Sequence, residues 1–162
     1  MRLVSITVEN YRSITKAHKI RLGSMTTLVG PNNEGKSNIL RALVVAMSVL
    51  TGERFQATIR GAERRFTLRY ALRGEYEWER DFPLHLQVAT PTGESRILLE
   101  FDLAPDEITQ FRDEIGSVLN GTLPLRIALG PRGHYTVAVA KPGRGGKTLT
   151  AKSPQIAAFV AE

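Results

Sequence analysis

One octapeptide limits the possible folds of this chain more than any other feature. Residues 30–37 read GPNNEGKS and match the pattern G-x-x-x-x-G-K-[ST] of a phosphate-binding loop, or P-loop. The glycines let the backbone turn tightly, so that successive N–H groups point inward at an anion. Lys36 would reach the β- and γ-phosphates of a nucleotide, and the Ser37 hydroxyl would bind Mg²⁺. The loop therefore predicts a nucleotide-binding site.

The periodicity on both sides of the loop agrees with such a site. Residues 25–29 form a short apolar run that is typical of a buried strand. After the loop, apolar residues recur at steps of three and four, which predicts a helix that begins at Lys36 and ends before Gly52. One face of this helix should be apolar, with Ile39, Leu40, Leu43, Val44, Met47 and Leu50. A helix N-terminus at the loop would favour bound phosphate.

Short strands and one further helix are predicted for most of the remaining chain. Alternation and β-branched residues predict strands at 2–8, 16–22, 66–72, 84–88, 96–103, 123–129 and 134–140. Turn signals at 90–93 and 130–133 predict two hairpins. Pro105 and the acidic residues after it open a helix whose apolar side carries Ile108, Phe111, Ile115 and Leu119. Residues 142–147 form a basic, glycine-rich loop.

The end of the sequence predicts a helix that has barely begun. Ser153 is a suitable N-cap, and Pro154 suits the first helical position. Because the sequence stops soon afterwards at Glu162, we expect it to be part of a longer chain.

Composition limits the classes of binding partner and the cellular compartment that we expect for this protein. The formal net charge is +6, from 22 Lys and Arg against 16 Asp and Glu, which favours polyanions such as nucleic acid, although an ordinary solvated surface is an alternative. The absence of cysteine excludes disulfides and thiolate zinc sites. It fits a cytoplasmic location, which we expect. No apolar stretch approaches the roughly 18 residues of a spanning helix, so we expect no membrane partner.

Two stretches and their spacing carry a resemblance to a known group of proteins. The opening ITVENYRSI resembles a strand followed by the motif N-[FY]-R-S, and TTLVGPNNEGKSNILRAL resembles the P-loop and helix of the same proteins. These proteins are the ABC-type ATPase heads of the SMC, RecF and OLD families. The resemblance covers roughly the first 50 residues well and the remainder loosely.

The resemblance implies an α/β P-loop NTPase fold. The whole chain, 1–162, would be the N-terminal lobe of an ABC-type ATPase head, with a mixed β-sheet around a central P-loop helix. Within it, 1–55 would form the strand, P-loop and helix core, 56–152 a strand-rich portion, and 153–162 the start of a helix leading out. Such heads bind ATP and Mg²⁺, hold two nucleotides between two heads, and act on DNA. The implied partners are therefore ATP, DNA and a second copy of the head. OLD relatives add a downstream nuclease domain.

The resemblance also implies roles for individual residues. Lys36 would be the catalytic residue and Ser37 the metal ligand. The cofactor-binding set would comprise Arg12, Ser13, Gly30, Pro31, Asn32, Asn33, Glu34, Gly35, Lys36, Ser37 and Asn38. Arg12 occupies the motif position whose arginine lies near the nucleotide; an ordinary surface arginine is the alternative. Glu34 stands where the relatives often carry a small residue, and its charge could weaken phosphate binding.

Two hydrolytic elements of these families have no match in the sequence. A Walker B strand needs an apolar run followed by Asp-Glu, but residues 97–102 place Glu100 inside the run, and Leu103 stands where the base should be. We interpret this segment as an ordinary strand. No Leu-Ser-Gly-Gly signature is present either, and Gln155 is a weak candidate for the glutamine that bridges Mg²⁺ and water. We therefore expect this chain alone to bind nucleotide weakly and to hydrolyse it negligibly.

Two other classes of protein are also compatible with the sequence. A P-loop small-molecule kinase would use the same loop, with the arginines of residues 60–69 as a lid. A non-catalytic basic module that binds nucleic acid or a partner, with a vestigial P-loop, would bind DNA with a steep salt dependence and ignore ATP.

Overall fold

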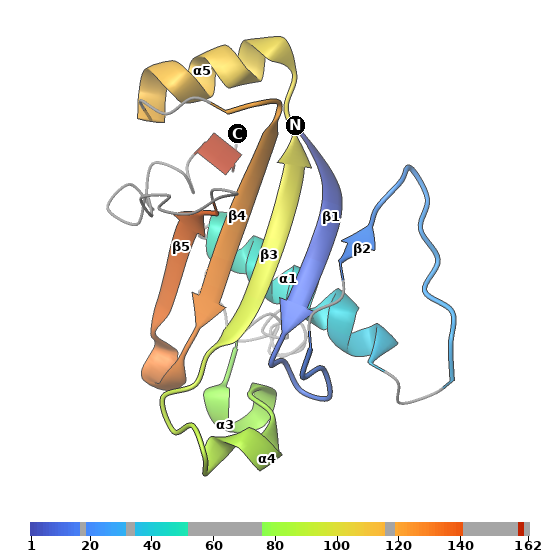
Figure 1. Cartoon of the computed structure of the whole chain (residues 1–162), viewed down its shortest axis with the longest axis vertical. Helices are drawn as coiled ribbons and strands as arrows, with labels where there is room; N and C mark the ends of the chain where they lie inside the picture. Colours follow the sequence, from blue (N-terminus) through green and yellow to red (C-terminus); the bar gives the residue numbers. More distant parts are fainter. Residues whose placement is uncertain (17–18, 32–34, 52–75, 116–118, 141–158, 161–162) are drawn as a thin grey trace, which may run out of the picture.

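The protein is built on one antiparallel sheet. The computed structural model describes residues 1–16, 19–31, 35–51, 76–115, 119–140 and 159–160. Five strands lie in the order β2-β1-β3-β4-β5, and all four described pairings are antiparallel (Figure 1). The strands are β1 (Arg2–Glu9), β2 (Ile20–Arg21), β3 (Ser95–Asp102), β4 (Thr122–Leu129) and β5 (Tyr135–Val139).

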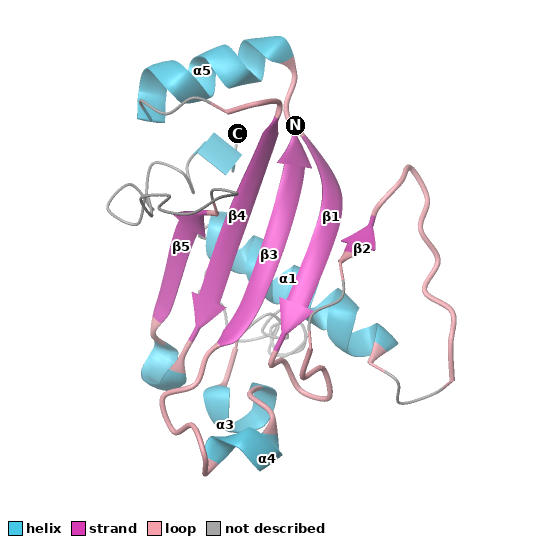
Figure 2. Cartoon of the chain, viewed as in Figure 1, coloured by secondary structure: helices cyan, strands magenta, loops and turns pink. Residues whose placement is uncertain are grey.

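The described helices lie behind the sheet and at its two ends. They are α1 (Lys36–Thr51), α3 (Trp78–Asp81), α4 (Leu84–Gln87), α5 (Pro105–Ile115) and the 3₁₀ turn η2 (Pro131–Gly133). The helix α1 crosses behind the strands, α5 lies at the end where β3 finishes, and α3 and α4 lie at the opposite end (Figure 2). This arrangement confirms the predicted α/β fold with the P-loop helix packed on the sheet. The sheet was predicted to be mixed, but every described strand pairing is antiparallel.

The core lies between α1 and the sheet. Because side chains alternate along a strand, every second residue of β1, β3 and β4 faces α1. The buried strand residues include Ile6, Val8, Ile97, Leu99, Leu125 and Ile127, and α1 contributes Ala42, Val45, Ala46 and Leu50. Burial of these apolar side chains is what stabilises a sheet that has one helical layer.

Several sequence-based predictions are confirmed. The strand predicted at 2–8 is β1, the strand at 96–103 is β3, and β3 is the ordinary strand expected at residues 97–102. The helix α5 begins at Pro105, and Glu107 caps it by accepting a hydrogen bond from the Ala104 N–H at 2.8 Å. The strands β4 and β5 pair across Gly130 to Gly133 as a hairpin.

The strand and hairpin predicted at 84–88 are wrong. Residues Leu84–Gln87 form the short helix α4, although the turn after it is present, with the Gly93 N–H bonded to the Thr90 carbonyl at 2.8 Å. Pro83 precedes the helix with φ −56°, a value that suits entry into a helical turn. Leu84 and Val88, whose alternation with Leu86 suggested a strand, are exposed.

The buried strand predicted at 25–29 is also wrong. These residues have no strand assignment, and Met25 and Val29 are 88% and 89% exposed. A strand needs a neighbour for its backbone N–H and C=O groups, and β2 is the edge of the described sheet on this side. Among the described residues of the strand predicted at 16–22, the two of β2 are in a strand, and residues 17 and 18 lie outside the described part of the chain.

The helix α1 begins at Lys36 as predicted, but its buried face is displaced from the predicted one. Leu40 and Val44 are exposed, whereas Val45 and the neighbouring alanines are buried. The sequence pattern marks every apolar residue alike, and contact with the sheet selects which of them are covered.

Other predictions lie outside the described residues. They concern Asn32, Asn33 and Glu34 of the P-loop, the helix stop at Gly52, the strand at 66–72, the loop at 142–147, the helix start at Ser153 and Pro154, and Gln155.

Within the described part of the chain, no helix has both the length and the apolar character needed to cross a bilayer.

Replacing Gly93 by alanine should destabilise the protein. A Cβ at this position would lie 2.4 Å from Cζ of Phe82, whose buried ring stacks on Trp78 at 5.2 Å between centroids. We expect Gly93→Ala to lower the free energy of unfolding by about 1–3 kcal/mol through overpacking. Urea denaturation checks this, with Gly23→Ala as control, because a Cβ there meets its nearest atom at 3.6 Å. Equal stability of the two variants would contradict the packing argument.

Acid should destabilise the sheet through Glu100 of the central strand β3. Lys19 and Ser5 both donate hydrogen bonds to the Glu100 carboxylate, and they hold its pKa below the ordinary 4.5. A lowered folded-state pKa stabilises the protein above the unfolded-state pKa, and this stabilisation is lost as the pH falls through the folded-state value. Glu100→Gln should therefore lose less stability than the wild type between about pH 7 and pH 3 in urea denaturation. Glu79→Gln, which removes an exposed carboxylate, should keep the wild-type profile.

Candidate nucleotide-binding site

The described ends of the P-loop meet the N-terminus of α1. Gly35 has φ +90°, a left-handed conformation that glycine adopts without strain, and Lys36 is the first residue of the helix. The first N–H groups of α1 lack acceptors within the helix, and the helix dipole adds partial positive charge there. This end of α1 therefore favours an anion such as a phosphate group.

Lys36 lies over the loop that precedes it. Its Nζ donates hydrogen bonds to the carbonyl oxygens of Gly30 and Pro31. The ammonium group is thereby held at the start of the loop rather than extended into solvent. Ser37, the next residue, is exposed on the first turn of α1.

A tight turn after β1 packs against the P-loop. Tyr11 and Ile14 exchange two backbone hydrogen bonds, of 2.8 and 2.9 Å, which close the turn around Arg12 and Ser13. Asn10 and Arg12 both have φ +53°, which is uncommon for residues with a side chain. The Tyr11 ring is buried beneath the turn.

Contacts between the turn and the P-loop bring several predicted site residues together. The Ser13 Oγ accepts a hydrogen bond of 2.9 Å from Nδ2 of Asn38, in the first turn of α1. A Cβ added to Gly35 would lie 3.3 Å from Cγ1 of Ile14 and 3.4 Å from the Ser13 Oγ. Glycine thus allows the close approach of the turn to the loop, and Ser13 is joined to the helix that follows the loop.

Arg12 is paired with Asp81 of α3 and is not an unpaired surface arginine. Its Nε and Nη2 contact the Asp81 Oδ1 at 2.8 and 2.7 Å, and its backbone N–H donates to the Asp81 carbonyl at 2.6 Å. The Asp81 side chain is 0% exposed. Arg80 and the Glu77 N–H also donate to this carboxylate.

Asp81 is the residue that sequence reasoning missed. Burial on its own raises the pKa of this carboxyl, but hydrogen bonds from Arg80 and the Glu77 N–H, with the charge of Arg12, outweigh burial and hold the pKa below its ordinary value. Asp81 lies in the polar stretch EWERD, which has no motif and no periodicity. Its role depends on a long-range contact that the sequence pattern does not indicate.

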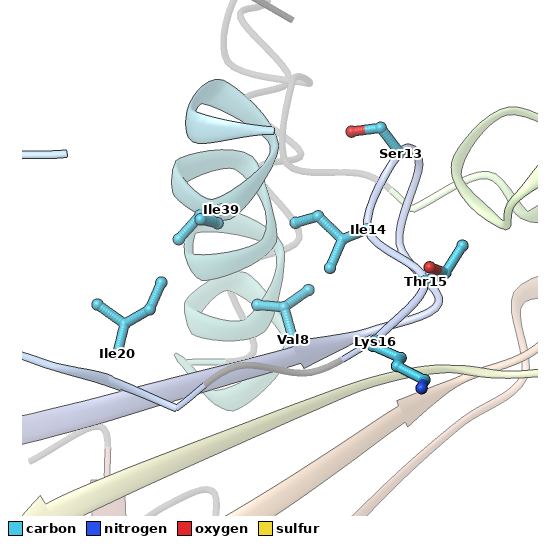
Figure 3. A pocket seen from close by; sticks show the side chains of 7 residues that line it. All are labelled: Val8, Ser13, Ile14, Thr15, Lys16, Ile20 and Ile39. Carbon is cyan, nitrogen blue, oxygen red and sulfur yellow. The ribbon is translucent and has the colours of Figure 1, made fainter. Parts of the chain in front are cut away.

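A pocket of about 280 Å³ adjoins the turn and α1 (Figure 3). Val8 of β1, Ile14 of the turn, Ile20 of β2 and Ile39 of α1 provide apolar walls. Polar side chains come from Ser13, Thr15 and Lys16. Apolar walls with a few polar groups are typical of a small-molecule site.

The residues present fit a nucleotide phosphate chain. Gly35 adjoins the N-terminus of α1, the Lys36 ammonium is bonded to the carbonyl oxygens at the start of the loop, and Ser37 is exposed on the first turn of the helix. Among the residues that the structure describes, no group of three or more His, Cys, Asp or Glu side chains could hold a metal.

The fold is that of an SMC ATPase head, and the loop carries the P-loop motif. Comparison with known families identifies an ATPase domain. The family described as AAA ATPase domain matches residues 1–81, which is half of the chain, and the chain belongs to this family.

Two solved structures share this fold, and one relative matches part of the sequence. An SMC ATPase described for ATP-driven dimerization and DNA-stimulated activation superimposes with a TM-score of 0.56 at 15% identity, over 99% of this chain and 78% of that one. An SMC head bound to the C-winged helix domain of ScpA gives a TM-score of 0.54 at 14% identity, over 99% of this chain and 40% of that one. At these identities the likeness shows the fold. An uncharacterised protein of Methanocaldococcus jannaschii is 46% identical over 43 residues, which span 26% of this chain and 13% of that protein.

Proposed function

We propose that this chain is the ATP-binding lobe of an SMC-like ATPase. The observation that supports it best is the P-loop at the N-terminus of α1, with Lys36 held over the loop and the Ser13 turn packed on Gly35. The backbone N–H groups of the loop and helix would bind the phosphates. Lys36 would neutralise charge on the β- and γ-phosphates, and Ser37 would bind Mg²⁺.

The neighbouring pocket would receive the nucleoside end of ATP. It lies beside the turn whose Ser13 is bonded to Asn38 of α1, so it is continuous with the phosphate-binding elements. Its isoleucine walls suit the faces of a base, and Thr15 and Lys16 offer polar contacts at its edge. Bound Mg²⁺ would supply charge neutralisation on the phosphates.

The whole protein would use ATP to act on DNA as a pair of heads, in the cytoplasm. The structurally similar SMC ATPase is described with ATP-driven dimerization and DNA-stimulated activation. The net charge of +6 also favours a polyanionic partner. Repair, chromosome maintenance and defence against phage are the processes in which such coupling would serve, and a nuclease domain would be compatible with it.

Direct titration of ATP, with and without Mg²⁺, tests the proposal. We expect saturable binding that Mg²⁺ strengthens, with negligible turnover by this chain. Sedimentation at saturating ATP would show whether two copies associate. DNA binding measured across a salt series separates the remaining alternative: binding that is steeply salt-dependent and indifferent to ATP would favour a basic module with a vestigial loop. Phosphate transfer to a nucleoside in a substrate screen would favour a kinase.

A further inference from the structure

We propose that Asp81 is a positioning residue for the P-loop, acting through the turn at residues 11–14. The expected effect of Asp81 on ATP binding rests on the proposed function. The expected effect of Asp81 on the conformation of the turn rests on the observed contacts alone. Asp81 lies on α3, far along the chain from the loop, and its polar side-chain contacts with described residues are to Arg12, Arg80 and Glu77. It would act by holding Arg12 and therefore the turn that the loop packs against.

Asp81 holds the turn through both the Asp81 side chain and the Asp81 backbone carbonyl. Two nitrogens of the Arg12 guanidinium contact the same carboxylate oxygen, and the Arg12 N–H donates to the Asp81 carbonyl. Arg80 Nη2 and the Glu77 N–H donate to the other carboxylate oxygen at 2.7 and 3.0 Å. A fully buried carboxylate with this many donors has one well-defined orientation.

Contacts of this kind are needed to stabilise the turn because its backbone is strained. Asn10 and Arg12 both lie in the left-handed region, at φ +53°, where a side chain has an unfavourable contact with its own backbone. Residues persist in this region when surrounding contacts determine their conformation. Asp81 supplies these contacts at Arg12, and the Ser95 Oγ supplies one at Asn10 by donating to its carbonyl.

The turn passes this constraint to the loop. Ser13 and Ile14 lie against Gly35, and the Ser13 Oγ accepts the hydrogen bond from Asn38 in the first turn of α1. Movement of the turn would therefore alter both the space beside Gly35 and the side-chain contact at the start of α1. Phosphate binding depends on the placement of these same elements.

The test compares ATP affinity in Asp81→Asn with the wild type, at a temperature where both are folded. Asparagine keeps the size and an acceptor oxygen but removes the charge that holds Arg12. We expect the dissociation constant for Mg²⁺–ATP to rise about tenfold or more, the effect of losing one charge-assisted contact. Amide hydrogen exchange at Tyr11 and Ile14, which are bonded to each other, should become faster.

Two further variants separate positioning from general stability. Phe111→Ala removes a fully buried ring on α5, at the opposite end of the sheet from the turn (Figure 1), so it should lower stability and leave ATP affinity unchanged. Arg12→Lys keeps the positive charge but loses the two-nitrogen contact with Asp81, and it should weaken ATP binding like Asp81→Asn. The double variant should bind ATP no more weakly than the single variant with the lower ATP affinity. If Asp81→Asn does not fold, amide hydrogen exchange at Tyr11 and Ile14 in Arg12→Lys decides the same question, because it reports on the turn directly.

The outcomes distinguish this proposal from the proposed function. Wild-type affinity in both Asp81→Asn and Arg12→Lys would overturn the positioning role while ATP binding stands. Absence of ATP binding by the wild type would overturn the proposed function. In that case amide hydrogen exchange at Tyr11 and Ile14 would test whether Asp81 restrains the turn. Faster exchange in Asp81→Asn would support this restraint, and unchanged exchange would overturn it.

Discussion

Replacing Lys36 by alanine should reduce ATP affinity by about 10- to 100-fold. The ammonium group is the one described cation held over the loop at the start of α1, and its hydrogen bonds to phosphate oxygens would be charge-assisted. Losing such bonds costs about 1.5–3 kcal/mol of binding free energy, which corresponds to that range of affinity. Isothermal titration with Mg²⁺–ATP measures the change.

Stability should change little in Lys36→Ala, so loss of binding would not reflect unfolding. Lysine in the first turn of a helix opposes the helix dipole, and alanine has a high helix propensity. These gains should offset the loss of the hydrogen bonds to Gly30 and Pro31 to within about 1 kcal/mol. Arg41→Ala is the matched control, because it removes an exposed positive charge from the same helix. Equal affinity of Lys36→Ala and wild type would contradict the proposed role of the loop.

Replacing Leu50 by alanine should cost about 2–5 kcal/mol of unfolding free energy. Leu50 is 1% exposed in the core between α1 and the sheet, so its truncation leaves a cavity as well as removing apolar contacts. The same substitution at Leu40 should change stability by less than about 0.5 kcal/mol, because that side chain is 58% exposed. Urea denaturation of both variants measures the difference.

This comparison tests the orientation of α1 directly. Both positions are leucines on one helix, so helix propensity changes equally and only burial differs. A large loss of stability in Leu40→Ala would mean that the face carrying Leu40 and Val44 is covered, contrary to the structure. Equal small losses at both positions would place the packing of α1 on the sheet in doubt.

Local sequence patterns were sufficient for much of the fold and for the centre of the site. The P-loop motif located Lys36 as the first residue of α1, and alternation located β1, β3 and the hairpin of β4 and β5. These features depend on neighbours in sequence: backbone geometry at glycine, the period of a strand and the period of a helix. The stretch that carries the N-[FY]-R-S resemblance forms a turn whose Ser13 and Ile14 lie against Gly35.

Only the tertiary structure decided which apolar residues are covered and what holds the turn in place. The runs at 25–29 and 84–88 are as apolar as those of true strands, but the first has no described strand beside it and the second follows Pro83 into a helical turn. Arg12 finds Asp81 across a long separation in sequence, and no periodicity records that contact. Patterns of residues determine local conformation, whereas burial and ion pairing depend on which distant segments meet.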